Sequence, residues 1–247
     1  MPELAFESVT FEEALTFAIN RKAVLPDEYF GQRQGIARAE SFSVTGLSRL
    51  AQINQIKDSL AAALEEGMTF QSWKETAVVD DLLSKLPEYR IRETFGTNVQ
   101  MSYARGKCLS QAKTADRKPW LLYSAVGDSR TRPGHLAMHK TLLPRDDPFW
   151  IDNRPPNGHL CRCTPIALTD KQARARGGAT QPSIDSISGE PGRADEGWDF
   201  DICRDSRSGS RVLTREALKN ESVMVTNAMG NVKAESNRQD PSEWSRS

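Results

Sequence analysis

The stretch from Trp120 to Leu168 constrains the fold of this chain most, because it gathers residue types that are scarce elsewhere. It contains all three histidines and two of the four cysteines: His135, His139, His159, Cys161 and Cys163. It opens with the apolar run WLLYSAV, which has the length and the aromatic and branched content of a β-strand and stops at Gly127. We therefore expect a strand here that leads into a polar turn.

A short helix is predicted after this turn. Pro133 suits the first position of a helix because its ring fixes φ at a helical value. His135, Met138 and His139 follow at spacings of three and four residues, which place side chains on one helix face. We expect the helix to end near Pro144 and the two imidazoles to point the same way.

Two turns and a second strand are predicted farther along. Residues 145–148 (RDDP) and 154–158 (RPPNG) combine proline with Asp, Asn or Gly, which is typical of turns. Cys161 and Cys163 then alternate with Arg162 in a predicted strand, where every second side chain lies on the same side. Both thiols should therefore face one way.

The residues before this stretch are predicted to be helical. The clearest helix spans residues 48–66, where apolar residues recur every three to four positions, and Gly67 follows it as a typical C-terminal residue. Its apolar residues are Leu50, Ile53, Ile56, Leu60 and Leu64. We interpret this region as a helical packing layer.

Two more helices are predicted, at residues 69–86 and 88–113, separated by Pro87. The apolar face expected for the second comprises Tyr89, Phe95, Val99, Tyr103 and Leu109. Gly96 and Gly106 would weaken this helix by about 1 kcal/mol each. Close contact between each glycine and a neighbouring element would explain their presence.

The character of the chain changes after Leu168. Residues 169–197 nearly lack large apolar side chains, so burial cannot offset their ordering entropy, and we interpret them as a linker or an extended arm. The sequence Gly-Trp-Asp-Phe at 197–200 is predicted to dock this arm onto a surface. A short helix at 211–224 and a disordered end at 227–247 are expected beyond it.

Length and composition bound the architecture. With 247 residues the chain can bury a proper core, but 38% apolar residues and a mean hydropathy of −0.57 leave a substantial part for surface or tail. The predicted class is α+β. We expect a helical N-terminal region (1–86), a small mixed α/β core (87–168), and a polar linker with an extended, partly disordered C-terminal arm (169–247).

The charge balance argues against binding of nucleic acid through a global field, since 33 basic and 33 acidic residues cancel. Any DNA contact must therefore be local. Two basic clusters are candidates: Lys171, Arg174 and Arg176, and then Arg204, Arg207, Arg211 and Arg215. Both lie in polar sequence with few aromatic residues to stack on bases, so a solvated linker is the competing interpretation.

The number and spacing of the cysteines indicate the redox environment of the protein. Four cysteines, at positions 108, 161, 163 and 203, do not make a dense disulfide framework, and Cys161 and Cys163 are too close for an ordinary bridge with each other. The sequence shows neither a long apolar segment nor a secretory signal, so we expect a protein made and kept in the cytosol. Reduced thiols or a metal are the expected states.

A metal site is one interpretation of the central stretch. His135, His139, Cys161 and Cys163 supply two nitrogens and two thiolates, the ligand set that tetrahedral zinc prefers. In the alternative, the cysteines are small buried hydrophobes and the histidines bond to turn backbone. The spacing is not that of a standard zinc finger, and the sequence leaves both open.

An enzymatic interpretation also exists, because five residues are of types that serve as acid, base or phosphate clamp in nucleases. They are Asp128, Arg130, Arg132, His135 and His139. Against this, the stretch has no Gly-rich phosphate cradle, serine elbow or His-Glu-x-x-His motif. In the structural alternative, Asp128 and Arg130 fix the turn, while Arg162 pairs with a carboxylate such as Asp146 or Asp147.

A series of motifs stands in order along this stretch: DSRTR-x-x-H-x-x-x-H, then DDPFW, then PPNG-x-x-CRC. The series resembles the signature of the phage Mu F-like minor head proteins, the phage head morphogenesis family, and weaker similarity extends upstream. Its core residues here are Asp128, Arg130, Arg132, Pro155, Pro156, Gly158 and Arg162. Some relatives carry Cys-x-x-Cys near the first histidine, where this chain has Arg-Pro-Gly-His.

The resemblance implies a structural component of a phage head that serves procapsid assembly and DNA packaging or ejection, inside the shell or near the portal. Implied partners are the portal protein, major capsid or scaffold proteins and packaged DNA, without a membrane. The implied location is the virion, and the host cytoplasm during assembly. The competing class is a metal-dependent nuclease or a toxin-like effector that uses Asp128, Arg130, His135 and His139.

Overall fold

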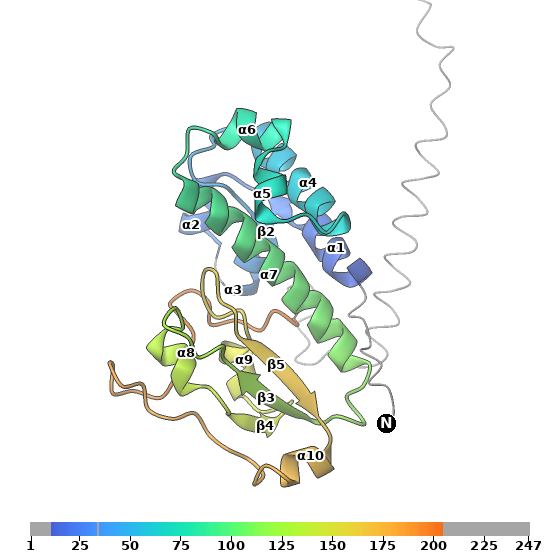
Figure 1. Cartoon of the computed structure of the whole chain (residues 1–247), viewed down its shortest axis with the longest axis vertical. Coiled ribbons are helices and arrows are strands. Elements are labelled where there is room, and N and C mark those ends of the chain that lie inside the picture. Colours follow the sequence, from blue (N-terminus) through green and yellow to red (C-terminus); the bar gives the residue numbers. More distant parts are fainter. Residues whose placement is uncertain (1–10, 34, 205–247) are drawn as a thin grey trace, which may run out of the picture. The chain divides into compact units, whose positions relative to one another are not determined.

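A computed structural model describes residues 11–33 and 35–204 (Figure 1). It combines helices with small sheets, which confirms the predicted α+β class. The elements are α1 (Phe11–Asn20), β1 (Lys22–Ala23), α2 (Pro26–Gly31), α3 (Gly35–Ala39), β2 (Ser41–Phe42), α4 (Leu50–Glu65), α5 (Phe70–Lys74), α6 (Ala77–Leu83), α7 (Glu88–Ala112), β3 (Trp120–Ser124), α8 (Pro133–Ala137), β4 (Leu142–Pro144), α9 (Phe149–Asn153), β5 (Thr164–Leu168) and α10 (Asp170–Arg174).

The predicted helix at 48–66 is α4, which packs against α1, α6 and α7. Its buried residues include the predicted Ile53, Ile56, Leu60 and Leu64. Leu50, the first residue of the helix, is 48% exposed. Gly67 has a φ of 66°, the left-handed conformation expected after a helix end.

The predicted helix at 69–86 is divided into α5 and α6. Thr69 caps α5 by accepting a hydrogen bond from the backbone N of Ser72 at 3.2 Å. The hydroxyl of Thr76 donates to the carbonyl of Trp73 at 2.8 Å, which competes with helix continuation. Trp73 is fully buried, and its indole N–H donates to the hydroxyl of Ser59 at 3.1 Å.

The helix α7 is continuous, as predicted, but its buried face differs from the expected one. Tyr89 and Tyr103 are 63% and 43% exposed. The buried positions are Ile91, Thr97, Met101, Ser102, Arg105, Gly106 and Cys108. Several of these are small or polar, so apolar spacing could not reveal the face.

The two glycines of α7 do lie in close contacts. A Cβ on Gly106 would come within 3.0 Å of the backbone N of Ala14 in α1. A Cβ on Gly96 would meet a methyl group of Leu160 at 2.5 Å. The predicted reason for both glycines is therefore confirmed.

The WLLYSAV run forms β3, the central strand of an antiparallel sheet in the order β4-β3-β5. Alternate residues of β3 are buried, and Leu121 and Tyr123 pack with Met138, Leu143 and Trp150 in one apolar cluster. Trp150 belongs to α9, which therefore covers this face of the sheet. Because Ser124 pairs with Thr164, the residues beyond these strand ends lie near each other.

Residues 169–197, interpreted from the sequence as a linker or an extended arm, include a short helix and backbone pairing with the sheet. The side chains of Thr169 and Gln172 form a capping box that starts α10. Farther along, Thr180 bridges to Leu142 of β4. Backbone pairing of this kind, which composition does not reveal, offsets part of the ordering entropy.

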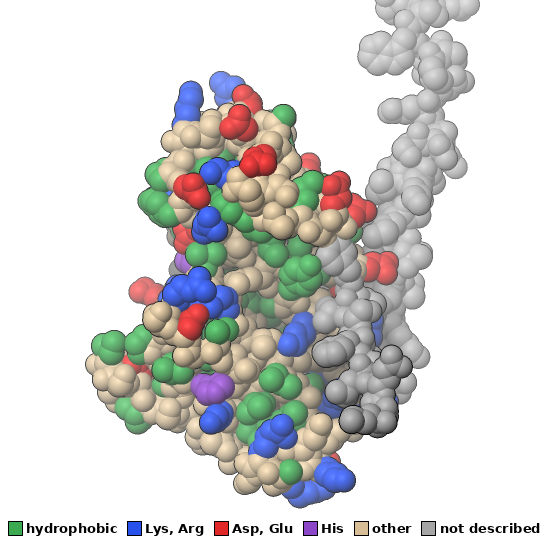
Figure 2. All heavy atoms as spheres, viewed as in Figure 1, with side chains coloured by type: hydrophobic (Ala, Val, Ile, Leu, Met, Phe, Trp, Pro, Cys, Tyr) green, Lys and Arg blue, Asp and Glu red, His purple; other side chains and the backbone are tan. Residues whose placement is uncertain are grey.

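The basic residues of this segment remain on the surface. Lys171, Arg174 and Arg176 are exposed on α10 and just after it. Figure 2 shows mainly basic side chains over this part of the molecule and mostly acidic ones over α4 to α6. A local DNA contact at this surface stays a prediction.

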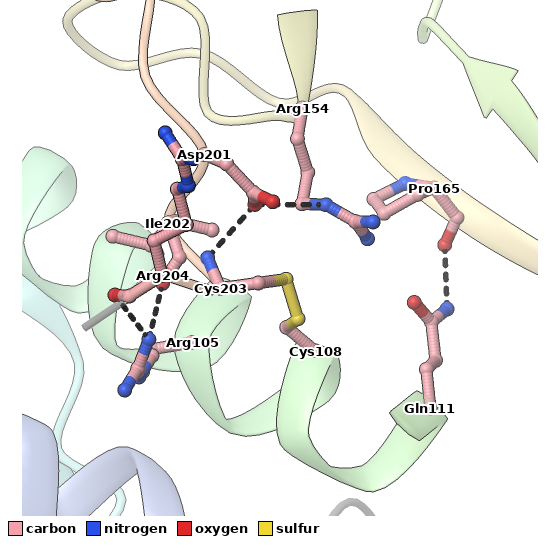
Figure 3. The surroundings of a disulfide bond; sticks show 9 residues. All are labelled: Arg105, Cys108, Gln111, Arg154, Pro165, Asp201, Ile202, Cys203 and Arg204. Carbon is pink, nitrogen blue, oxygen red and sulfur yellow. Dashed lines mark hydrogen bonds and ion pairs between the residues drawn. A yellow bond between two sulfur atoms is a disulfide. The ribbon is translucent and has the colours of Figure 1, made fainter. Parts of the chain in front are cut away.

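The chain then docks onto α7 through residues 198–204, hereafter the 198–204 segment. Its buried residues Trp198, Phe200, Ile202 and Cys203 pack with Ala39, Met101 and Cys108. The docking predicted for 197–200 is thus confirmed. Cys108 and Cys203 form a disulfide with their Cα atoms 5.8 Å apart, so these two thiols are not reduced, contrary to expectation (Figure 3). They are separated by 95 residues, and only the docking brings them together.

Buried charges reinforce this docking (Figure 3). Arg105 of α7 donates to the carbonyls of Ile202 and Arg204, at 2.8 Å each. The guanidinium Nε of Arg154 lies 3.0 Å from Oδ1 of Asp201. Such partners are required because an unpaired buried charge is costly.

Among the described helices, none combines the length and the apolar character needed to cross a membrane. The predicted helix at 211–224, the predicted disordered end at 227–247, and the basic residues Arg207, Arg211 and Arg215 lie outside the described residues.

Candidate functional site

The turn after β3 is organised by Asp128. Its Oδ1 accepts a hydrogen bond from the backbone N of Arg130 at 3.1 Å. Arg162 donates to both carboxylate oxygens at 2.6 and 2.8 Å, and these hydrogen bonds hold the pKa of Asp128 well below its usual range. Arg162 thus pairs with Asp128 instead of Asp146 or Asp147, because the β3–β5 pairing brings the two strand ends together.

Beside this turn, the side chains of His135, Cys161 and Cys163 converge. Their ligand-type atoms all lie within 4.8 Å of one another, and Nδ1 of His135 is 3.7 Å from Sγ of Cys161. His135 lies on α8, and the cysteines lie directly before β5, which begins only at Thr164. The predicted strand is therefore displaced along the chain, but both thiols face the same cluster, as expected.

His139, the fourth predicted ligand, lies elsewhere. The helix α8 ends at Ala137 because residues 142–144 join the sheet as β4, so the predicted shared helix face does not reach His139. Its Nδ1 accepts a hydrogen bond from the backbone N of Ala125 at 3.2 Å. Three of the four predicted metal ligands thus come together. The nuclease site that would have used both His135 and His139 is not formed, because the two histidines lie apart.

Sequence reasoning missed one member of the cluster, Asp195. Its Oδ1 lies 3.1 Å from Nε2 of His135, and its Oδ2 lies 3.1 Å from Nε of Arg132. Its backbone N donates to the carbonyl of Asn157 at 2.9 Å. Asp195 sits in the polar stretch interpreted as a linker, and no local pattern distinguishes it from its neighbours.

The PPNG motif is the buried support of this arrangement. Pro155, Pro156, Asn157 and Gly158 are all buried, and the Pro155–Pro156 peptide bond is cis. A Cβ on Gly158 would collide with the carboxylate of Asp195. The motif glycine is therefore required for close approach of the two segments.

The thiols and the imidazole are electrostatically coupled. A hydrogen bond from Cys163, opposed by burial and assisted by His135, lowers the pKa of Cys161 to about 4. Burial opposes protonation of His135, but the hydrogen bond and charge of Cys161, together with Asp195, outweigh it and raise the pKa of His135. The hydrogen bond with Cys161 and burial raise the pKa of Cys163.

A small pocket opens onto the cluster and is lined by the two cysteines, His135 and three arginines, Arg130, Arg132 and Arg162. All three arginines pair with carboxylates: Arg162 and Arg130 with Asp128, and Arg132 with Asp195. The side chain of Arg130 is 77% exposed. The pocket is only large enough to bring water to side chains that are otherwise buried.

The chain carries a phage Mu F-like region: residues 54–166, from within α4 to β5, match the family described as phage Mu protein F like protein. It is similar to "Putative capsid assembly protein F" of Escherichia phage Mu, with 28% identity over 160 residues, which is 57% of this chain and 36% of that protein. It is also similar to "Mu-like prophage FluMu F protein" of Haemophilus influenzae, with 39% identity over 88 residues.

That second match covers 36% of this chain and 21% of the Haemophilus protein, so the chain corresponds to only part of either relative. No solved structure matches the chain. The family match confirms the resemblance predicted from the motifs. Asp195 and Cys203, which complete the cluster and the disulfide, lie beyond the matched residues.

Proposed function

We propose that this protein is a minor head protein of a Mu-like tailed phage or prophage, with a structural role in procapsid assembly and in DNA packaging or ejection. The main support for this proposal is the family match over residues 54–166. The matched region includes the motif residues Asp128 and Arg162, which join the turn after β3 to the segment before β5. The names of the relatives support this role, since one is named a putative capsid assembly protein F and the other is the F protein of a Mu-like prophage.

The geometry of the motif residues supports a structural role over a catalytic one. Asp128 and Arg162 are engaged with each other, and Pro155, Pro156 and Gly158 are buried. These residues therefore serve to hold segments of the chain together. A reactive centre would instead present such groups toward a substrate.

The proposed partners are the portal protein and the major capsid or scaffold proteins, in the head interior or near the portal. Apolar side chains exposed on several elements are available for such contacts: Phe30, Tyr89, Ile184 and Ile187. Packaged DNA is a further proposed partner through Lys171, Arg174 and Arg176. The proposed locations are the virion and, during assembly, the host cytoplasm.

Mass spectrometry of procapsids purified after induction tests this proposal. We expect the protein at low copy beside the portal and capsid proteins, and its absence from them would contradict the assignment. A Gly158→Ala variant should incorporate poorly because its Cβ collides with Asp195. Gly31→Ala is the matched control, since a Cβ there meets nothing within 4 Å.

A nuclease assay tests the competing class. Purified protein is incubated with DNA and RNA in Mg²⁺, Mn²⁺ or Zn²⁺, beside His135→Ala and His139→Ala variants. We expect no metal-dependent cleavage. Cleavage that both variants lose would overturn a purely structural role, because it would show that the two histidines act together.

A further inference from the structure

We propose that His135, Cys161 and Cys163 bind one zinc ion, with Asp195 as the carboxylate that orients the histidine and with water as the fourth ligand. The site would join α8, the segment before β5 and the chain around residue 195. This inference does not depend on the proposed head function, because it concerns only the convergence of donor atoms.

The distances fit the chemistry of zinc. Tetrahedral zinc with bonds of about 2.3 Å to sulfur and about 2.0 Å to nitrogen holds its ligand atoms roughly 3.5–3.8 Å apart. Nδ1 of His135 lies 3.7 Å from Sγ of Cys161, and all three donor atoms lie within 4.8 Å of one another. Small side-chain adjustments are enough to bring the set into coordination.

The far side of the imidazole is also arranged as in metal sites. A metal-bound histidine usually donates its second ring N–H to a carboxylate, which fixes the ring and its tautomer. Nε2 of His135 lies 3.1 Å from Asp195, so a proton on Nε2 leaves Nδ1 free to face the thiols. Asp195 is itself held by Arg132 and by the carbonyl of Asn157.

The fourth coordination position faces the pocket. Asp128, the carboxylate of the adjoining turn, is engaged by Arg162, and His139 accepts a backbone hydrogen bond away from the cluster. The pocket is the route by which solvent reaches the cysteines. Water therefore completes the tetrahedron.

A competing reading of the same atoms is a nucleophilic thiol, with Cys161, His135 and Asp195 in a row. Cys161 is 4% exposed and His135 is 2% exposed. A nucleophile has to contact its substrate, and reactive cysteines are at least partly exposed. Burial of this degree favours a metal ligand over a reacting group.

Elemental analysis of the full chain, purified without chelator, tests the proposal. We expect about one zinc per chain, and a marked loss of metal in Cys161→Ser, Cys163→Ser and His135→Ala. His159→Ala is the matched histidine control, because His159 is half exposed and pairs with Glu93. The double variant Cys108→Ser, Cys203→Ser is the thiol control, and both controls should keep the metal.

Two further measurements keep the test decisive if a ligand variant fails to fold. Cobalt(II) added to the metal-free wild-type protein should give the visible absorption of a tetrahedral site and a thiolate charge-transfer band. Asp195→Asn keeps every ligand and should bind zinc about 10–100-fold more weakly.

The proposal is overturned by less than about half an equivalent of metal together with melting that EDTA does not change. Rapid alkylation of Cys161 by iodoacetamide in the native protein as purified would also overturn it, in favour of the nucleophile. Procapsid incorporation is measured separately, so a metal-free protein that still enters procapsids would remove the zinc site and leave the head function intact.

Discussion

The helical layer around Trp73 and the junction around Cys161 are held together in different ways. In the helical layer, Ile53, Ile56 and Trp73 are fully buried apolar residues from helices close in sequence. In the junction, charged and sulfur-bearing side chains meet from three separate segments, and Asp195 comes from far along the chain. Apolar burial is non-directional, whereas these polar contacts need every partner in place.

Apolar burial in the helical layer therefore stabilises the protein, whereas the polar contacts of the junction specify how its segments are arranged. The helical layer should lose most stability when volume is removed, and it should respond little to reductant or pH. The β region and its docked 198–204 segment should respond to reductant, which breaks the disulfide, and to pH, which changes the charges. Four predictions test this contrast, from the largest expected effect to the smallest.

Trp73→Ala should lower the free energy of unfolding by about 3–5 kcal/mol, because it leaves a cavity among α4, α5 and α7. Denaturant unfolding measures the loss. Tyr89→Ala removes a large aromatic residue that is mostly exposed, and it should change stability by no more than about 0.5 kcal/mol. Equal effects in the two variants would show that the layer is not held by burial.

The double variant Cys108→Ser, Cys203→Ser should lose about 2–5 kcal/mol, because the cross-link restricts the unfolded chain. Thermal melting with and without reductant measures this. Reductant should lower the melting temperature of the wild-type protein and leave the double variant unchanged. A wild-type melting temperature that does not change when reductant is added would contradict the presence of the disulfide.

Gly106→Ala should cost about 1–3 kcal/mol, since its Cβ meets the backbone of Ala14, which cannot move alone. Gly96→Ala should cost less, because the atom it meets is the end of the flexible Leu160 side chain. Chemical unfolding of the two variants ranks them. A larger loss of stability for Gly96→Ala would mean that α1 shifts more easily than the Leu160 side chain.

Arg162→Ala should have the smallest effect, and that effect should depend on pH. The pKa of Asp128 is lower in the folded protein than the ordinary value of 3.8, so the pair stabilises the fold above about pH 4 and stops doing so as the pH falls through the folded pKa. The melting difference between wild type and variant should therefore shrink in acid. Arg130→Ala, at a more exposed position, is the control and should show a smaller difference throughout.

The sequence predicted what depends on local pattern. The recurrence of Ile53, Ile56, Leu60 and Leu64 identified α4, and the apolar run from Trp120 identified β3. The predicted end of the histidine-bearing helix failed because residues 142–144 pair with β3, a contact that helical spacing does not contain. Local rules locate elements well when burial alone decides them.

The candidate site was only partly accessible to such rules. His135, Cys161 and Cys163 are of unusual types in one short stretch, so composition singled them out. Asp195 is an ordinary residue in polar sequence, and no local pattern identifies Cys108 as the partner of Cys203. Both roles arise from docking of segments distant in the chain. The Asp128 partner of Arg162 was missed for the same reason, since only the β3–β5 register makes them neighbours.

The disulfide has a mechanical consequence. It closes a covalent ring from α7 to the 198–204 segment, and the whole β3–β4–β5 sheet with its histidine and thiols lies inside that ring. Tension applied to the polypeptide beyond Cys203 would pass through the sulfur bridge directly into α7. The sheet would be shielded from this tension, so its fold would not be distorted.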